Sequence, residues 1–312
     1  MGPFLGLGSE DGFDVEGRSL RGDPEGRARE VVAACTRTHA PCRAADGAQG
    51  DPGTHYMTVH SVRTDTGGET GVVEDIFRIN RRGHVVPAAL WRPASGTAPG
   101  LVLLGHGAGG HKRARRMIDL SRWLVTEAGL AAVAIDGPFH GDRHTEPITP
   151  ERHQALVAAE GAAAVVDRMV EDWLATIDAV GELGVVATDA LGYFGLSMGT
   201  RYGLPLAAAL GDRLHTAVLG KFGLNHPGRP AALDTTEITR AAAQRITAQT
   251  MFHIQWHDQV FPRDGQLALF DLLACPDKRL VAYPGHHADA TPDAVASWRD
   301  FLARTIIRQP ID

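Results

Sequence analysis

The stretch LGYFGLSMGTRYG, residues 191–203, passes from an apolar segment into a helical one through a serine. Gly195 and Gly199 stand two positions before and after Ser197. A serine on a sharp strand-to-helix turn needs small neighbours at these positions, because larger side chains would collide with the adjacent strand and helix. The pattern therefore predicts an exposed, nucleophilic serine at the end of a strand. A glycine-rich turn with an incidental serine has the same short sequence.

Short apolar runs alternate with helical patterns on both sides of this stretch. We predict strands at 72–80, 84–93, 100–106, 130–136, 190–196, 214–221, 250–256 and 279–283. The clearest helix is 162–182, whose apolar residues recur on one helical face. A last helix should begin at Pro292, with Thr291 as its cap. Strands that alternate with helices predict an α/β fold, with a mainly parallel sheet covered on both faces.

The composition limits the classes of partner. The chain has 312 residues, of which 44% are hydrophobic and 22% charged, as in ordinary soluble domains. Its net charge of −6 argues against nucleic acid as a partner. No run approaches the length of a membrane span and the start lacks the pattern of a secretory signal, so we expect a cytoplasmic protein. We interpret the local basic cluster as the solvated face of a helix: Lys112, Arg113, Arg115 and Arg116.

The first 56 residues differ from the rest of the chain. They are rich in Gly, Arg, Asp and Ala and poor in large apolar groups. Such a segment buries too little surface to offset its ordering entropy, so we expect a disordered or loosely docked tail over 1–56 and a catalytic domain over 57–312. The three cysteines cannot build a disulfide framework; Cys35 and Cys42 could pair, but two free thiols in a reducing compartment are the expectation.

Chemistry-bearing residues gather at predicted strand ends, where open α/β sheets bind their ligands. Strand 100–106 runs into GHGAGG (105–110), whose amides can approach an oxyanion closely. We expect the amides of Ala108 and Met198 to form an oxyanion hole, with Met198 at a helix N-terminus. His106 is interpreted as a residue that braces this loop. A tight connection without catalytic function has the same composition.

Two further strand ends carry a carboxylate and an imidazole. Asp258 follows strand 250–256, and His286 and His287 follow strand 279–283. The order Ser197, Asp258, His287 is the nucleophile–acid–base order of one particular fold. Asp258 is preferred to Asp264, which falls inside a predicted helix. Adjacent side chains in a loop diverge, so the two histidines cannot both face the serine.

From residue 72 to residue 307 the chain resembles the serine α/β-hydrolases, and among them the dienelactone-hydrolase-like esterases. The matching pieces are HGAGG (106–110), GLSMG (195–199), D-x-x-F-P (258–262) and PGHH (284–287). The resemblance implies an eight-stranded sheet, a Ser–His–Asp triad and hydrolysis of an acyl bond without a cofactor. The spacing P-G-x-H favours His287 as the base. One departure is Gln255, where the family usually has glycine three residues before the acid.

We therefore predict a serine carboxylic-ester hydrolase with the catalytic residues Ser197, Asp258 and His287, which acts on a small to medium ester through an acyl-enzyme. Segments 143–160 and 225–245 could form a small lid. The candidate substrate-pocket residues are Phe139, His140, Phe222, Trp256, Phe261 and His286. No metal is expected, because His140, Asp142 and His144 lack the spacing of known zinc motifs.

Several alternatives stay open at this level. A peptidase or a thioesterase would use the same triad, as would perhydrolysis or lyase chemistry. A hydrolase fold without catalytic activity could instead serve binding. The physiological substrate and the oligomeric state, a homodimer included, are also left open by the sequence.

Overall fold

The computed structural model describes residues 56–66, 71–144 and 148–306. Apart from Tyr56, the predicted tail lies outside the described residues, and so do Cys35 and Cys42. The remaining cysteine, Cys275, is a buried free thiol.

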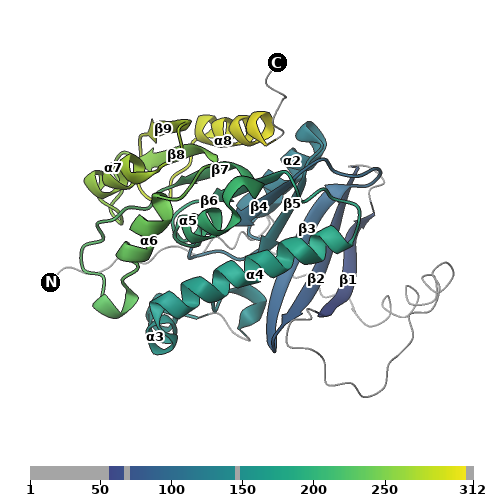
Figure 1. Cartoon of the computed structure of the whole chain (residues 1–312), viewed down its shortest axis with the longest axis horizontal. Helices are drawn as coiled ribbons and strands as arrows, with labels where there is room; N and C mark the ends of the chain where they lie inside the picture. The colour runs from purple at the N-terminus through teal and green to yellow at the C-terminus, as the bar shows by residue number, and fades with distance from the viewer. Residues whose placement is uncertain (1–55, 67–70, 145–147, 307–312) are drawn as a thin grey trace, which may run out of the picture. The chain divides into compact units, whose positions relative to one another are not determined.

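Within the described residues nine strands form one sheet, in the order β1-β2-β3-β5-β4-β6-β7-β8-β9 (Figure 1). The strands are β1 Tyr56–Thr66, β2 Val72–Arg81, β3 His84–Pro93, β4 Leu101–Gly105, β5 Ala131–Ile135, β6 Leu191–Gly195, β7 Leu214–Gly220, β8 Gln249–Gln255 and β9 Lys278–Tyr283. Pairing is antiparallel from β1 through β2 and β3 to β5, and parallel from β5 to β9. The eight predicted strands are thus confirmed as β2 to β9. The edge strand β1 was not predicted, because few of its residues are apolar.

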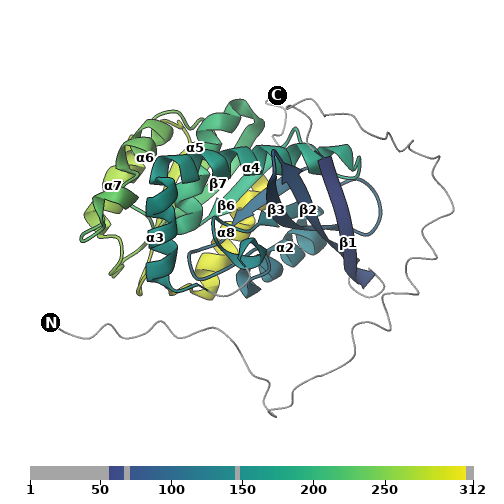
Figure 2. The same ribbon diagram turned by 90° about the horizontal axis from the view of Figure 1, so that it is seen from below.

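Helices cover both faces of the sheet. They are α2 Arg115–Ala128, α3 Pro150–Glu160, α4 Ala162–Glu182, α5 Met198–Leu210, α6 Thr236–Ala243, α7 Arg263–Leu272 and α8 Pro292–Thr305. Figure 2 shows α4 and α5 on one face and α2 and α8 on the other. The short helices α3 and α6 lie in the two segments that we expected to form a lid. No helix of the described ranges is long and apolar enough to cross a membrane.

The central strands are buried on both faces, which explains their unbroken apolar sequences. Every residue of β4, β5 and β6 is buried. Alternate side chains of β4 enter opposite cores, because successive residues of a strand point to opposite faces. Leu101 and Leu103 pack with α4 and α5, whereas Val102 and Leu104 pack with α2 and α8. This double burial fixes the carboxyl ends of β4 and β6, where the chemistry is predicted.

The last helix begins as its sequence predicts. The hydroxyl of Thr291 accepts a hydrogen bond from the amide of Ala294, and Pro292 is the first helical residue. Such a cap contributes about 1 kcal/mol. Trp298 and Leu302 are buried against the sheet, and the Trp298 ring lies 5.3 Å from that of Phe194 on β6. Helix α8 is therefore anchored directly after the loop that carries His287.

The interpretation of the basic cluster is wrong for two of its members. Lys112 is buried, and its ammonium forms ion pairs with Asp136 at 2.8 Å and Asp142 at 2.7 Å. Arg113 pairs with the buried Glu74 at 2.6 Å. Helix α2 begins only at residue 115, so these two residues belong to the preceding loop. Carboxylates buried at strand ends require cationic partners, which a local charge pattern cannot reveal.

Candidate active site

Ser197 stands between β6 and α5 in an unusual backbone conformation. Its φ is 58° and its ψ −116°. A positive φ is rare for a residue with a side chain and costs about 1–3 kcal/mol. The amide of Ser197 donates to the carbonyl of Gly220 on the neighbouring strand at 2.9 Å. The surrounding structure therefore holds a strained turn that presents the serine hydroxyl.

The two glycines that flank Ser197 allow the backbones of β6, α5 and β4 to approach one another closely. A Cβ atom on Gly195 would lie 2.8 Å from the carbonyl group of Gly199. A Cβ atom on Gly199 would lie 2.5 Å from the carbonyl oxygen of Gly105, at the end of β4. Side chains are excluded at both positions for this reason. The close approach also places the start of the 105–110 loop beside the serine turn.

Two polar side chains that the sequence analysis missed support this turn. The hydroxyl of Tyr193, on β6, donates to the carbonyl of Gly199 at 2.6 Å. The hydroxyl of Thr200 lies 2.7 Å from the carbonyl oxygens of both Gly195 and Gly220, and accepts from the amide of Gly220 at 2.8 Å. Their acceptors are backbone carbonyls, so no motif in the sequence marks these contacts.

Among the three predicted catalytic residues, His287 lies within hydrogen-bonding distance of both Ser197 and Asp258. The hydroxyl of Ser197 donates to Nε2 of His287 at 2.9 Å. On the other side of the ring, Nδ1 of His287 donates to Oδ2 of Asp258 at 2.8 Å. This pairing fixes the neutral tautomer whose Nε2 can accept a proton from the serine. The residues come from the turn after β6, the loop after β8 and the loop after β9.

Asp258 is held as a carboxylate. Its side chain is fully buried, and its Oδ1 accepts from the amides of Val260 and Phe261, both at 2.8 Å. Burial alone would raise the pKa of Asp258. The hydrogen bonds from His287, Phe261 and Val260, together with the attraction that His287 exerts when it is protonated, outweigh burial and keep that pKa below its ordinary value.

The competing residues have other contacts. The amide of His286 donates to Asp289 Oδ2 at 2.7 Å, and its Nδ1 lies 3.2 Å from the carbonyl of His257. Its side chain is therefore turned toward the loop after β8. Asp264 lies exposed in the first turn of α7. The structure thus joins His287 to Ser197, and Asp258 to His287.

Gln255, the departure from the family pattern, anchors the histidine loop. We use this name for residues 284–289. Trp298 Nε1 donates to Nδ1 of the buried His253 at 3.2 Å, so Nε2 of His253 donates to Gln255 Oε1 at 2.9 Å. Gln255 Nε2 then donates to the carbonyl of Pro284 at 2.8 Å. Burial lowers the pKa of His253 to about 4, which keeps this chain of hydrogen bonds neutral.

The loop 105–110, the predicted oxyanion loop, is oriented by His106. The amide of Gly137 donates to His106 Nε2 at 2.8 Å, so Nδ1 carries the proton and donates to the carbonyl of Gly107 at 2.7 Å. Burial, with a contribution from His140, lowers the pKa of His106 to about 3. Because the peptide is planar and trans, a fixed Gly107 carbonyl also fixes the direction of the Ala108 amide.

Met198, the other predicted oxyanion donor, is the first residue of α5. Its amide is among the N–H groups that have no acceptor within their own helix. The loop and the helix start meet at the contact between Gly105 and Gly199.

Phe139 and His140 follow β5, and His140 contacts the oxyanion loop at Ala108. Nε2 of His140 is 2.8 Å from the carbonyl of Ala108, and its Nδ1 is 2.7 Å from the carbonyl of Pro138. Phe139 has a φ of 61°, and the guanidinium of Arg168 lies 5.4 Å from its ring centre. In the part of the chain that the structure describes, no cluster of three or more His, Cys, Asp or Glu residues could hold a metal ion.

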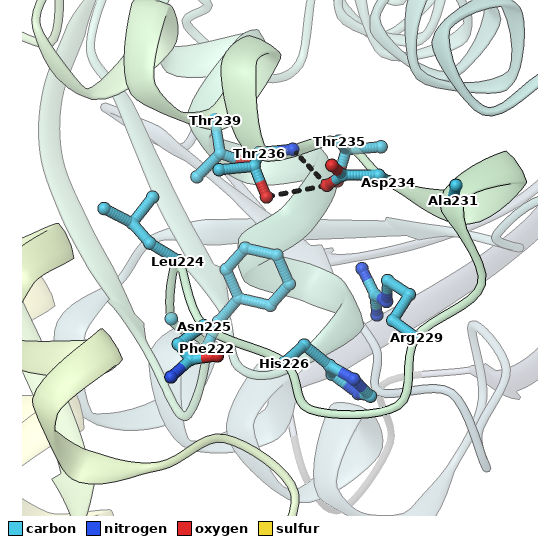
Figure 3. A pocket seen from close by; sticks show the side chains of 11 residues that line it. Phe222, Leu224, Asn225, His226, Arg229, Ala231, Asp234, Thr235, Thr236 and Thr239 are labelled. Atoms are coloured by element: carbon cyan, nitrogen blue, oxygen red, sulfur yellow. Dashed lines mark hydrogen bonds between the residues drawn. The ribbon is translucent and has the colours of Figure 1, made fainter.

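A cavity of about 350 Å³ lies beside the end of β7 (Figure 3). It is lined by Phe222, Gly223, Leu224, Asn225, His226, Arg229, Ala231, Asp234, Thr235, Thr236 and Thr239. The Phe261 ring lies 4.8 Å from the rings of Phe222 and His226 and 5.8 Å from that of His287. One aromatic ring therefore connects the cavity wall to the imidazole that bonds Ser197.

Of the six predicted pocket residues, Phe222 lines this cavity and Phe261 packs against it. Trp256 is 46% exposed, with the guanidinium of Arg263 4.0 Å from its ring centre, and His286 is exposed at the surface. Most of the lining comes instead from the predicted lid segment 225–245. No pattern in the segment marks these polar residues individually, so they were not predicted.

Comparisons with known proteins agree with this fold. No protein-family model and no curated protein matches the sequence. A solved structure of a cold-adapted esterase from an Arctic intertidal metagenomic library is 31% identical, covers 76% of this chain and 95% of its own, and has a TM-score of 0.65. An acetyl xylan esterase from Paenibacillus sp. R4 is 20% identical, with 81% of this chain and 89% of that chain covered and a TM-score of 0.64.

A third similar structure is a protein from Klebsiella pneumoniae assigned as a dienelactone hydrolase. It is 20% identical, covers 74% of this chain and 97% of its own, and has a TM-score of 0.59. The last two likenesses concern the fold, whereas the 31% identity over nearly the whole Arctic esterase extends to the sequence. The chain therefore belongs with the Arctic esterase to the α/β-hydrolases and is a carboxylic-ester hydrolase.

Proposed function

We propose that this protein hydrolyses carboxylic esters through an acyl-enzyme, with Ser197 as nucleophile, His287 as general base and Asp258 as the acid that orients it. The observation that carries the proposal is the continuous line of hydrogen bonds from Ser197 Oγ through His287 to Asp258, at 2.9 Å and 2.8 Å. All three residues lie in 57–312, the segment that we assign to the catalytic domain.

In the first step His287 Nε2 takes the hydroxyl proton of Ser197 while the oxygen attacks the ester carbonyl. The imidazolium that forms is stabilised by the carboxylate of Asp258. This carboxylate stays ionised because three hydrogen bonds reach it. His287 then gives the proton to the departing alcohol, which leaves an ester between the acyl group and Ser197.

The amides of Ala108 and Met198 bind the negative charge that develops on the carbonyl oxygen. Donors that are already oriented need no rearrangement during the reaction, and the loss of one typically costs about 3–4 kcal/mol of barrier lowering. The His106 hydrogen bond to Gly107 supports this role for Ala108. In the second step water attacks the acyl-enzyme with His287 as base, and Ser197 is regenerated.

The cavity beside β7 suits a small to medium substrate with polar groups. Its volume of about 350 Å³ is at the lower end of the range for small-molecule pockets. The ring of Phe222 offers one apolar surface, and polar groups surround it (Figure 3): Asn225, Arg229, Asp234, Thr235, Thr236 and Thr239. We propose that it receives one half of the ester, on the Phe261 side of His287.

The test is a series of aryl esters of increasing acyl length, assayed with the wild type and Ser197→Ala. We expect the variant to lose at least about a thousandfold in kcat and to keep its circular dichroism spectrum. A matched control is Ser121→Ala, which removes a buried serine hydroxyl of α2 that donates to the Met117 carbonyl. This control should retain full activity.

A fluorophosphonate probe supplies a second measurement. It should label Ser197 in the wild type and leave Ser197→Ala unlabelled. A folded wild type that is neither labelled nor active on any ester of the series would contradict the proposed function and favour a binding protein.

A further inference from the structure

Lys221 occupies a strained position at the end of β7. Its φ is 47°, and it is 2% exposed although it carries a charge. Its amide donates to the carbonyl of His253 on β8 at 2.8 Å. The preceding Gly220 has a φ of 140°, and a Cβ atom there would overlap the same carbonyl. The chain therefore bends sharply against β8 just where the lysine side chain begins.

The ammonium of Lys221 bonds the histidine loop. Nζ donates to the carbonyl of His287 at 3.1 Å and also to the carbonyl of Asp289. One acceptor belongs to the proposed base itself, and the other stands two residues later. A single cation thus ties the backbone around His287 to the strand end that also accepts the Ser197 amide.

The charges around Lys221 come from four elements. Arg116 on α2 repels the ammonium, whereas Asp258 after β8 and Asp289 after β9 attract it. His253 on β8 is the other titratable neighbour and is affected by the Lys221 charge. Within the described residues Nζ hydrogen-bonds only to the two carbonyl oxygens, and it forms no ion pair with a carboxylate. Burial, aided by Arg116, lowers the pKa of Lys221 to about 8 against the attraction of the two carboxylates.

Lys221 therefore makes two unfavourable contributions to the stability of the fold. A positive φ favours glycine or asparagine over lysine, and a buried cation without a carboxylate partner loses its hydration. Lys278 offers a comparison, since its ammonium also binds backbone carbonyls: those of Phe270, Asp271 and Leu273. Lys278 is only half-buried, however, and has no positive φ. Costs of this kind persist only where the surrounding structure enforces them, and they cluster at functional sites.

We infer that Lys221 is a positioning residue for His287: its ammonium fixes the backbone of the histidine loop so that the imidazole stays between Ser197 and Asp258. This inference rests on the proposed function. The ammonium acts on the carbonyl oxygens and not on the substrate. Its loss would let the loop shift, and a displacement of about 1 Å in such a site can cost a hundredfold in rate.

The experiment compares Lys221→Met with Lys221→Arg and with the control Lys278→Met, on one aryl ester. We expect Lys221→Met to lower kcat by about 10- to 100-fold with little change in KM, because the loop and not the substrate cavity is disturbed. Lys221→Arg keeps a cationic donor and should recover most of kcat. Lys278→Met should stay within about twofold of the wild type. Thermal unfolding identifies any variant that fails to fold.

The pH profile separates positioning from general support of the fold. The wild type should lose kcat/KM as the pH rises through about 8, where Lys221 gives up its proton. Lys221→Arg should keep its activity there, since an arginine stays charged. If Lys221→Met does not fold, the comparison of the wild type with Lys221→Arg alone decides. The same loss of kcat/KM at alkaline pH in both proteins would then overturn the inference.

A folded Lys221→Met with the kcat of the wild type also overturns it. An inactive wild type would instead contradict the proposed function itself, so the two failures are distinguishable.

Discussion

The oxyanion loop and the histidine loop reach Ser197 by opposite means. The start of the oxyanion loop is positioned by backbone packing, because Gly199 leaves no space for a side chain against Gly105, and His106 then orients Gly107 through its carbonyl. The histidine loop is positioned by polar side chains of neighbouring strands, since Gln255 and Lys221 each donate to its carbonyl oxygens. An added side chain should therefore disturb the oxyanion loop, whereas the loss of a hydrogen-bond donor should disturb the histidine loop.

The two loops also differ in the charge of the side chain that holds them. Burial keeps His106, which orients the oxyanion loop, neutral at physiological pH. The histidine loop is held by a cation, Lys221, whose pKa of about 8 lies close to that range. Acid should therefore disturb the first loop and alkali the second.

The largest effect is expected from Gly199→Ala. The new Cβ would lie 2.5 Å from the Gly105 carbonyl oxygen, so α5 or β4 must move. We expect a loss of about 1–3 kcal/mol in the free energy of unfolding and of about a hundredfold in kcat. Gly109→Ala is the control for stability, because its Cβ would enter open space. Urea unfolding and ester turnover are the measurements, and a Gly199→Ala protein with wild-type values would refute backbone packing.

A smaller effect is expected from Gln255→Gly, which restores the residue usual in the family. It leaves the carbonyl of Pro284 and the Nε2–H of His253 without their partner. We expect a loss of about 1–3 kcal/mol in stability and of about tenfold in kcat.

The control for Gln255→Gly is Thr176→Val on α4, which removes a buried hydroxyl that donates to the Asp172 carbonyl. It should lose stability without losing kcat. Equal kcat values for the two variants would mean that Gln255 supports only the fold.

The smallest effect concerns pH and His106. Its folded pKa of about 3 lies below the ordinary 6.5, so between these values the unfolded chain binds more protons. The free energy of unfolding should fall as the pH falls through this window, by at most about 1.4 kcal/mol per pH unit for this group. His106→Gln should show a weaker dependence in urea unfolding at pH 7 and pH 5. Equal slopes for the two proteins would exclude His106 as a source of acid sensitivity.

Local patterns in the sequence determined the order of the strands from β2 onward. Periodicity is a property of neighbouring residues, so continuous apolar runs marked β4, β5 and β6 without knowledge of the fold. The same patterns missed β1, α3 and α6, whose sequences are polar and whose formation depends on the elements they pack against. The glycines around Ser197 and the strand-end places of Asp258 and His287 were likewise readable, and the structure brings these three side chains together.

Only the tertiary structure decided what holds these side chains in place. Tyr193, Thr200, Gln255 and Lys221 all act on backbone carbonyl oxygens, which every residue possesses and no sequence pattern distinguishes. Lys112 was misread for a related reason, because its buried carboxylate partner stands 24 residues away on another strand end. Residue identity along the chain therefore determined which groups are available for chemistry, while burial and the approach of distant backbones decided which polar groups support them.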